Sequence, residues 1–325
     1  MPKFKILVTD YEYESLKIEE KIIQENGGEL LKAQCKTEEE VINAAKDVDG
    51  LLVQYAPIGR KVFESLPKLK VVARYGIGVD VIDVTAATEH DVAVLNVPDY
   101  CVEEVSDHAL ALLLACGRKI VLLNSLVKEG KWDYKLAKPI YRLKNKTLGL
   151  IGFGKIARNL AKKASSLGLK ILSFDPFLDH KITKHFNVEL VNFNTLLRAS
   201  DYISIHVPLN QDTKHLISID QFEMMKKSAY LINTSRGPII DEKALINALR
   251  NNQISGAALD VTEEEPLNKN SDLLNMENVI ITPHTAWYSE ESELTLHKNV
   301  AEGVVDFLTG KSPLYLVNKN VQRKF

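Results

Sequence analysis

The segment Thr147-Leu148-Gly149-Leu150-Ile151-Gly152-Phe153-Gly154-Lys155-Ile156-Ala157 lies near the middle of a chain of 325 residues. Its first five residues form an apolar run that predicts a buried parallel strand. Glycines at 152 and 154 end this run, and an amphipathic helix pattern follows over residues 155–167. A second apolar run, residues 170–174, ends in Asp175. Strand, glycine turn, helix, strand and acid in this order predict a βαβ unit that binds a dinucleotide.

Each residue type in this segment has a physical reason. Gly152 permits the tight turn, and Gly154 lets the backbone approach a pyrophosphate, whose charge the N–H groups at the helix N-terminus would bind. Asp175 would accept hydrogen bonds from the adenosine ribose and repel a 2′-phosphate. The sequence therefore predicts NAD as the cofactor in preference to NADP.

Composition excludes several classes of function. Charged residues make up 26% of the chain and the formal net charge is −2, so no basic surface for nucleic acid is expected. Cys35, Cys101 and Cys116 are widely spaced and form no CxxC pair, which is typical of reduced thiols in a cytoplasmic protein. The longest apolar run, residues 109–116, is too short to cross a membrane. We expect a soluble cytoplasmic protein with no nucleic-acid or membrane partner and no metal site.

The order of elements predicts two α/β domains, one of them discontinuous. A chain of this length exceeds one ordinary core. Helix and strand signals alternate before residue 99, one long helix is predicted over 102–128, and the alternation then resumes up to about residue 285. A helix over 290–308 would return to the first domain. We therefore expect a lid domain of residues 1–99 plus 287–325 around a nucleotide-binding domain of residues 100–286. Strands are expected at 6–9, 50–53, 71–73, 92–96, 147–151, 170–174, 202–206, 229–233, 255–260 and 278–281.

Candidate catalytic groups follow three strands of the nucleotide-binding domain. Arg236 could bind a carboxylate through two parallel N–H bonds. Residues 263–265 are three consecutive glutamates, and His284 is a side chain suited to proton transfer near neutral pH. The carboxyl ends of parallel strands lie at one edge of a sheet, so these groups should lie near the cofactor.

The chain resembles the D-isomer-specific 2-hydroxyacid dehydrogenases, which include phosphoglycerate dehydrogenase, glyoxylate reductase and the C-terminal-binding-protein corepressors. The resemblance depends on the glycine motif, on Ser235-Arg236-Gly237, on Glu265-Pro266 and on Pro283-His284. It implies a central Rossmann nucleotide-binding domain inserted into a smaller flavodoxin-like α/β lid domain, NAD as cofactor, and a small 2-keto or 2-hydroxy acid as substrate. It also implies that Arg236, Glu265 and His284 are the catalytic residues, and that the protein is a homodimer. The apolar helix over 104–116 would contribute to the dimer.

Further site residues are implied by the same resemblance. The loop Tyr75-Gly76-Ile77-Gly78 would bind the substrate carboxylate through backbone N–H groups, and Trp287 would border the substrate. The substrate-binding set is therefore Tyr55, Tyr75, Gly76, Arg236 and Trp287. The cofactor-binding set is Gly152, Gly154, Lys155, Ile156, Asp175, His206, Val207, Pro208, Thr213, Thr234, Ser235 and Asp260.

The sequence leaves three hypotheses for the function open. The first is an NAD-dependent enzyme that interconverts a 2-keto acid and a D-2-hydroxy acid, with His284 as general acid and base. The second is an NAD(H)-sensing binding protein of the corepressor type, and the third is a phosphoglycerate dehydrogenase. Residues 53–58 contain no basic side chain for a phosphate, and the aromatic rings of Tyr55 and Trp287 favour an apolar substrate tail.

Overall fold

The computed structural model describes residues 2–178, 182 and 185–321, and these residues form two compact units. Unit 1 contains residues 1–101 and 289–325, and unit 2 contains residues 102–288. The sequence placed the corresponding boundaries after residues 99 and 286. Each unit is described by itself.

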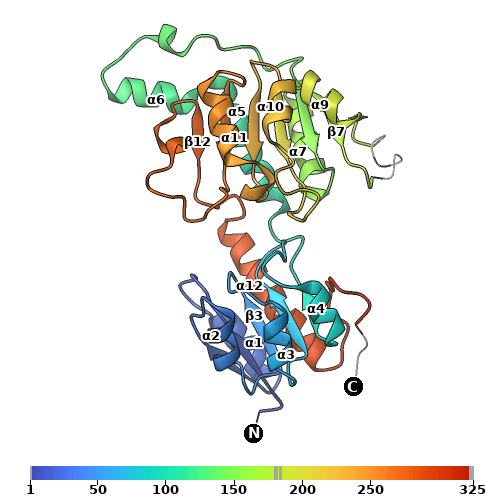
Figure 1. Cartoon of the computed structure of the whole chain (residues 1–325). Coiled ribbons are helices and arrows are strands. Elements are labelled where there is room, and N and C mark those ends of the chain that lie inside the picture. Colours follow the sequence, from blue (N-terminus) through green and yellow to red (C-terminus); the bar gives the residue numbers. More distant parts are fainter. Residues whose placement is uncertain (1, 179–181, 183–184, 322–325) are drawn as a thin grey trace. The chain divides into compact units, whose positions relative to one another are not determined.

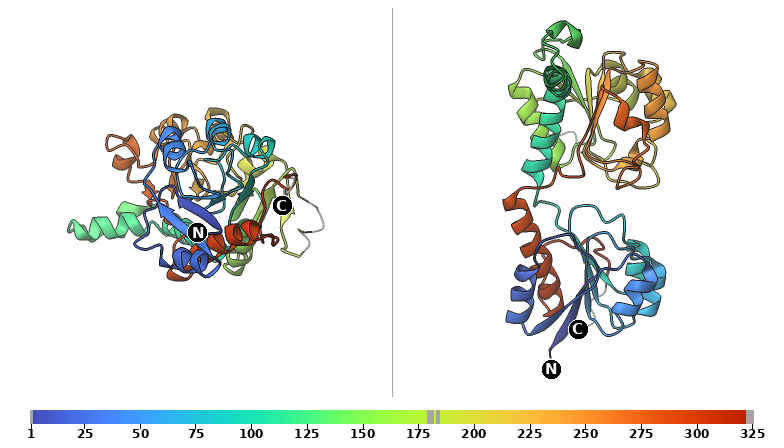
Figure 2. Two further views of the ribbon diagram at one scale, coloured as in Figure 1. Left: turned by 90° about the horizontal axis from the view of Figure 1, so that it is seen from below. Right: turned by 90° about the vertical axis from the view of Figure 1, so that its left-hand side faces the viewer.

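Unit 1 is built on a five-stranded parallel sheet with the order β2-β1-β3-β4-β5. This is the strand order of flavodoxin-like folds, so the predicted fold of the lid domain is confirmed. Helices α1 and α12 pack together on one face of the sheet, and α2, α3 and α4 cover the other face (Figures 1 and 2). The elements are β1 (Phe4–Val8), α1 (Lys17–Glu25), β2 (Gly28–Lys32), α2 (Glu38–Ala44), β3 (Gly50–Val53), α3 (Arg60–Ser65), β4 (Val71–Arg74), α4 (Val84–Glu89), β5 (Ala93–Leu95) and α12 (Glu290–Leu308).

Unit 2 is built on a seven-stranded parallel sheet with the order β12-β11-β10-β9-β6-β7-β8. The order reverses at β6, which is the Rossmann arrangement with one additional strand. Helices α5 and α7 lie on one face, and α9, α10 and α11 lie on the other. The elements are α5 (Val102–Arg118), α6 (Ile120–Lys128), η1 (Tyr134–Ala137), β6 (Thr147–Ile151), α7 (Lys155–Ser166), β7 (Lys170–Phe174), β8 (Glu189–Leu190), α9 (Phe193–Ala199), β9 (Tyr202–Ile205), α10 (Ile219–Met224), β10 (Tyr230–Asn233), η2 (Gly237–Ile239), α11 (Glu242–Arg250), β11 (Gly256–Leu259), η3 (Asp272–Asn275) and β12 (Val279–Ile281).

The central strands of both sheets are apolar because helices cover both of their faces. β3 and β9 are buried at every residue, and both lie inside their sheets. Edge strand β2, in contrast, alternates exposed and half-buried residues and includes Glu29 and Lys32. This strand was not predicted, because its polar residues directly follow a helix that ends at two glycines. Helix α4 and strand β8 were not predicted either.

The helix predicted over residues 102–128 is wrong as one continuous element. Lys119 has a left-handed backbone (φ 52°), and α5 and α6 are bent by 60° at this break. Helix α5 packs against α7, β10 and β11, and this contact buries Val105, Ala109, Leu112, Leu113 and Cys116 inside its own unit. Ala111 is exposed, and Leu110, Leu114 and Ala115 are half-buried. Helix α6 has no buried residue. Packing within the unit therefore accounts for most of the apolar character of residues 104–116.

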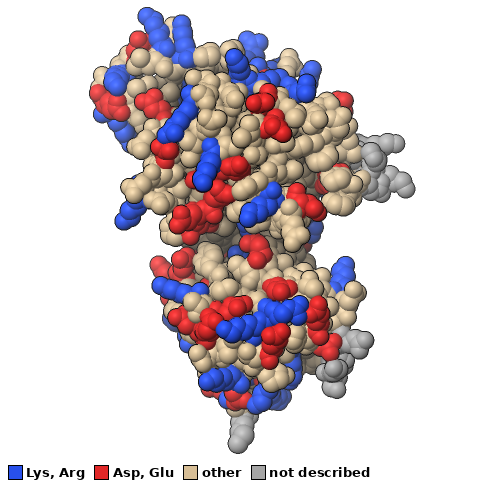
Figure 3. Space-filling view, viewed as in Figure 1, with Lys and Arg blue, Asp and Glu red and all other residues tan. Residues whose placement is uncertain are grey.

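Two surface properties follow from the described residues. On the face shown in Figure 3, basic and acidic side chains are interspersed rather than gathered by sign. Within the described part of the chain, no single helix is long and apolar enough to cross a membrane, although the bent pair α5 and α6 together meets that length and composition.

Candidate active site

The glycine turn between β6 and α7 has the backbone that its sequence requires. Gly152 has φ +87°, and a Cβ there would lie 2.7 Å from the carbonyl oxygen of His206. A Cβ at Gly154 would meet no atom within 4 Å. Gly154 is also the N-cap of α7, and no side chain caps this helix end. The turn therefore presents N–H groups toward open space at a helix N-terminus, which suits a pyrophosphate.

Asp175 ties the glycine turn to the end of β7. One carboxylate oxygen accepts from the N–H of Phe153 at 2.9 Å, and the other accepts from the N–H of Phe177 at 3.0 Å. At the end of β10, the hydroxyl oxygen of Thr234 is buried and has no hydrogen-bond partner in the described chain. An open glycine turn, a fixed acid and a buried hydroxyl that needs a partner all fit a bound NAD.

The other residues predicted to bind cofactor lie on the ends of neighbouring strands. His206 follows β9, and its Nε2 is 2.9 Å from the Ser204 hydroxyl. Burial lowers the pKa of His206 to about 4, so the imidazole is neutral at physiological pH. The Ser235 hydroxyl donates to the Val207 carbonyl at 2.8 Å, and the Thr213 hydroxyl donates to the Pro208 carbonyl at 2.6 Å. These contacts link the ends of β6, β9 and β10 at one edge of the sheet.

Asp260 holds the loop that contains His284. Its carboxylate accepts from the Thr282 hydroxyl at 2.6 Å and from the N–H groups of Thr285 and Ala286, each at 2.9 Å. Its carbonyl accepts from the N–H of His284 at 2.8 Å. Three donors take up most of the acceptor capacity of this buried carboxylate. The contact with cofactor expected for Asp260 stays a prediction, while its observed contacts position the histidine loop.

His284 and Glu265 form a close pair. Nδ1 of His284 is 2.7 Å from Oε2 of Glu265, and the two side chains are 29% and 36% exposed. His284 has a positive φ of 51°, which is uncommon for a non-glycine residue and is held here by Asp260. Burial alone would raise the pKa of Glu265, but its hydrogen bond and attraction to His284, the Thr262 N–H and the charge of Arg236 together lower that pKa below its ordinary value. Glu265 is therefore ionised throughout the neutral range.

Arg236 lies at the end of β10 in a backbone fixed by its neighbours. Asn233 donates from Nδ2 to the Arg236 carbonyl at 2.9 Å and accepts from the Ser235 N–H at 3.0 Å. The next residue, Gly237, is so close to the chain after β11 that a Cβ would lie 1.8 Å from the Thr262 carbonyl oxygen. The loops with Arg236 and Glu265 are thus packed directly against each other.

His108 is a residue of this site that sequence reasoning missed. It lies on α5, and its Nε2 is 3.0 Å from the Thr282 hydroxyl and 3.5 Å from Oδ1 of Asp260. The only signal in the sequence is a histidine at the start of the apolar part of this helix, after Ser106 and Asp107. Its partners are 152 or more positions away, so the sequence alone could not pair them.

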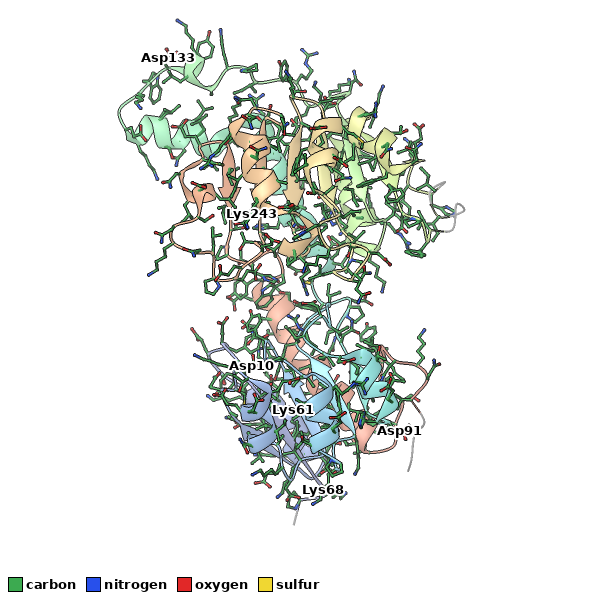
Figure 4. The ribbon with its side chains drawn as sticks, in the orientation of Figure 1. Asp10, Lys61, Lys68, Asp91, Asp133 and Lys243 are labelled. Carbon is green, nitrogen blue, oxygen red and sulfur yellow. The ribbon has the colours of Figure 1, made fainter. Side chains whose placement is uncertain are left out.

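Trp287 also belongs to unit 2, where its ring packs edge-on against Tyr288 with centroids 5.5 Å apart. The remaining predicted substrate residues belong to unit 1. Tyr55 follows β3, and its N–H donates at 2.6 Å to Asp10, which lies just after β1 (Figure 4). Tyr75 and Gly76 follow β4, and Gly76 has φ +138°. A Cβ at Gly76 would lie 1.6 Å from Nη1 of Arg74.

Comparison with known proteins identifies the family. Residues 110–286 match the family described as D-isomer specific 2-hydroxyacid dehydrogenase, NAD binding domain. The chain belongs to this family. It is 40% identical over 285 residues to a glyoxylate reductase of Korarchaeum cryptofilum, an alignment that covers 86% of each chain. It is also 41% identical to a D-3-phosphoglycerate dehydrogenase of Methanocaldococcus jannaschii over 97% of this chain, but over only 59% of that protein.

Solved structures agree with these relatives. A D-lactate dehydrogenase of Aquifex aeolicus complexed with NAD and lactic acid superimposes with a TM-score of 0.88 at 26% identity, covering 96% of this chain and 99% of that one. The predicted family, the Rossmann and flavodoxin-like fold, the class of enzyme and the cofactor are therefore confirmed. The protein is an NAD-dependent 2-hydroxyacid dehydrogenase.

Proposed function

We propose that this dehydrogenase reduces small 2-keto acids to D-2-hydroxy acids with His284 as the proton donor. The observation that carries the proposal is the contact of 2.7 Å between Nδ1 of His284 and the ionised Glu265. Because Nδ1 is engaged there, Nε2 remains to donate a proton to the substrate oxygen and to remove it again in the reverse direction. Bound NADH supplies the hydride to the carbonyl carbon, and the chain supplies the proton.

We propose that Arg236 binds the substrate carboxylate. A guanidinium presents two parallel N–H groups to a carboxylate, and the fixed backbone at 233–237 holds its base in one place. The loop at residues 75–78 of unit 1 is proposed to bind the same carboxylate, with the N–H groups of Ile77 and Gly78 as the donors, because those of Tyr75 and Gly76 donate to the Val53 and Arg74 carbonyls. Tyr55 and Trp287 are proposed to contact the substrate tail.

An apolar tail is the better match for these aromatic rings. Each methylene removed from water contributes about 0.8 kcal/mol, whereas a phosphate loses hydration without gaining a partner there. We therefore expect pyruvate and 2-ketobutyrate to give higher kcat/KM than phosphohydroxypyruvate, with glyoxylate, which has no tail, as the reference. Trp287→Ala should reduce that difference while leaving NADH affinity unchanged.

One observation favours a phosphorylated substrate instead. Arg74 has Nη1 directly against the α-carbon of Gly76, so a cation lies beside the proposed carboxylate loop. A phosphoglycerate dehydrogenase also aligns with 97% of this chain. Steady-state oxidation of NADH with the four keto acids separates the two, and a clear preference for phosphohydroxypyruvate would refute the apolar-tail proposal. If no keto acid is reduced while NADH binds, the catalytic proposal fails and a nucleotide-sensing function is favoured.

We further propose that the protein is a cytoplasmic homodimer that associates through α6 and the segment after it. None of its three cysteines forms a disulfide, as expected in a reducing compartment. The dimer proposal is supported by exposed apolar side chains on α6, which projects from its unit (Figure 1), and on the segment that follows it. These side chains are Ile120, Val121, Val127, Trp132, Tyr134 and Leu136.

Light scattering at micromolar concentration tests the dimer. We expect twice the chain mass of 36.5 kDa, and a monomer for the double variant with Val121→Asp and Val127→Asp. Leu314→Asp is the matched control, because Leu314 is 74% exposed in unit 1 and should not affect the dimer. A monomeric wild type would refute the proposal.

A further inference from the structure

A buried polar cluster lies in unit 1 and includes none of the proposed catalytic groups. Glu19 on α1 is fully buried, and its Oε1 accepts from the Tyr75 hydroxyl at 2.7 Å. The same oxygen contacts Nδ1 of His297 on α12, which is 3% exposed. The Tyr13 ring packs edge-on against the His297 ring, with centroids 4.3 Å apart. The cluster thus joins α1, α12 and the residue that follows β4.

Burying the polar groups of this cluster costs free energy that an apolar core would not require. A buried carboxyl group loses its hydration, and Oε2 of Glu19 has no hydrogen-bond partner among the described residues. Well-packed apolar side chains are often equally stable or more stable at such a position. What a connected buried polar network provides in addition is rigidity at the residues that it joins.

The residue held by the cluster is next to the proposed carboxylate loop. Burial raises the pKa of the Tyr75 hydroxyl well above its ordinary value, so the hydroxyl stays protonated and donates to Glu19. The Tyr75 N–H donates to the Val53 carbonyl at 2.9 Å, which fixes the backbone of the same residue. Directly after it, Gly76 takes a φ of +138° and its carbonyl accepts from the Val97 N–H.

The far side of the loop is held separately. Asn96 donates from Nδ2 to the Ile77 carbonyl at 2.7 Å. The Gly76 N–H is itself used, since it donates to the Arg74 carbonyl at 2.9 Å, so the N–H groups of this loop that could meet a substrate are those of Ile77 and Gly78. Besides the backbone hydrogen bonds, two side chains hold the loop, Asn96 on one side and Tyr75 on the other. Of these two side chains, only Tyr75 leads to a buried carboxyl group.

We propose that Glu19 is a positioning residue for the reaction, which holds Tyr75 and through it sets the N–H groups of Ile77 and Gly78 for the substrate carboxylate. The inference rests on the proposed function of that loop. Glu19 and His297 touch neither substrate nor cofactor in this role. Their effect should appear in the KM for the keto acid and in the binding of carboxylate analogues, with little change in kcat or NADH affinity.

The test compares Glu19→Gln, Tyr75→Phe and the double variant with the wild type. Tyr75→Phe removes the hydrogen bond between the Tyr75 hydroxyl and Glu19, and Glu19→Gln keeps an acceptor oxygen but replaces the carboxyl group that the hydroxyl contacts. We expect the KM for pyruvate and the inhibition constant of oxamate to rise in both, by about tenfold in Tyr75→Phe. The double variant should rise little further than Tyr75→Phe, because both single changes act on one interaction. The kcat and the NADH dissociation constant, the latter from fluorescence, should stay within about twofold of wild type.

Asn318→Ala is the matched stability control. Asn318 is also buried in unit 1 and makes hydrogen bonds to Val94, Thr88 and Val92, so its loss should lower Tm without changing the KM. Tyr75→Phe removes a single hydroxyl and keeps the test decisive if Glu19→Gln does not fold.

Two outcomes overturn the proposal. One is an unchanged KM in folded Tyr75→Phe, and the other is a rise in KM of the same size in Asn318→Ala. An inactive wild type would instead reject the proposed function itself, so the two failures can be told apart.

Discussion

Glu265→Gln is the sharpest test of the proposed catalytic pair. The change keeps the shape and an acceptor for Nδ1 of His284 but removes the charge. A hydrogen bond to a charged group contributes about 1.5–3 kcal/mol, and an exposed ion pair contributes about 0–1 kcal/mol. With side chains 29% and 36% exposed, the pair should lie near the lower end of the first range. A loss of about 1.5 kcal/mol corresponds to roughly tenfold in kcat/KM.

The assay is steady-state oxidation of NADH with pyruvate, accompanied by the NADH dissociation constant from fluorescence. Glu264→Gln is the matched control, because its carboxylate belongs to the same run of three acids but is exposed, and it is Glu265 rather than Glu264 that pairs with His284. We expect Glu264→Gln to retain wild-type kcat/KM and both variants to bind NADH normally. Equal kcat/KM in Glu265→Gln and Glu264→Gln would refute the assignment of Glu265.

Four further predictions concern the proposed site residues. His284→Ala should lower kcat by about 10²–10⁴-fold with little change in NADH affinity, and wild-type turnover in this variant would rule out His284 as the proton donor. Arg236→Lys should chiefly raise the KM for keto acids, because the point charge of a lysine cannot reproduce a bidentate contact. NAD should give a higher kcat/KM than NADP because of the carboxylate of Asp175, and equal use of the two cofactors would contradict this. Because the pKa of His206 is lowered in the folded chain, the unfolded chain binds more protons than the folded chain between pH 6.5 and about 4. The free energy of unfolding should therefore decrease as the pH falls through that window, by up to about 3 kcal/mol. His206→Gln should remove that part of the pH dependence in urea unfolding, and parallel curves for wild type and variant would contradict the burial of a neutral imidazole.

Local sequence patterns determined the elements that lie deep in each sheet. Strands over 147–151 and 170–174 and the helix over 290–308 have the predicted bounds, because apolar runs and helical periodicity report burial directly. The order of these elements also determined the two α/β folds, and short motifs such as Pro283-His284 selected the proposed catalytic residues. These features depend on residues close to one another in the chain.

Only the tertiary structure decided the elements and contacts that depend on exposed residues or on residues far apart in the chain. Strand β2 forms because it pairs with β1, although its own residues are partly polar. The predicted long helix breaks at Lys119 because α5 is buried against its sheet while α6 is not. Glu19 and His297 are separated by 278 positions in the chain, and no local pattern could pair them. A side chain's partners are set by the packing of whole elements, so the contacts that position a site emerge only after the chain has folded.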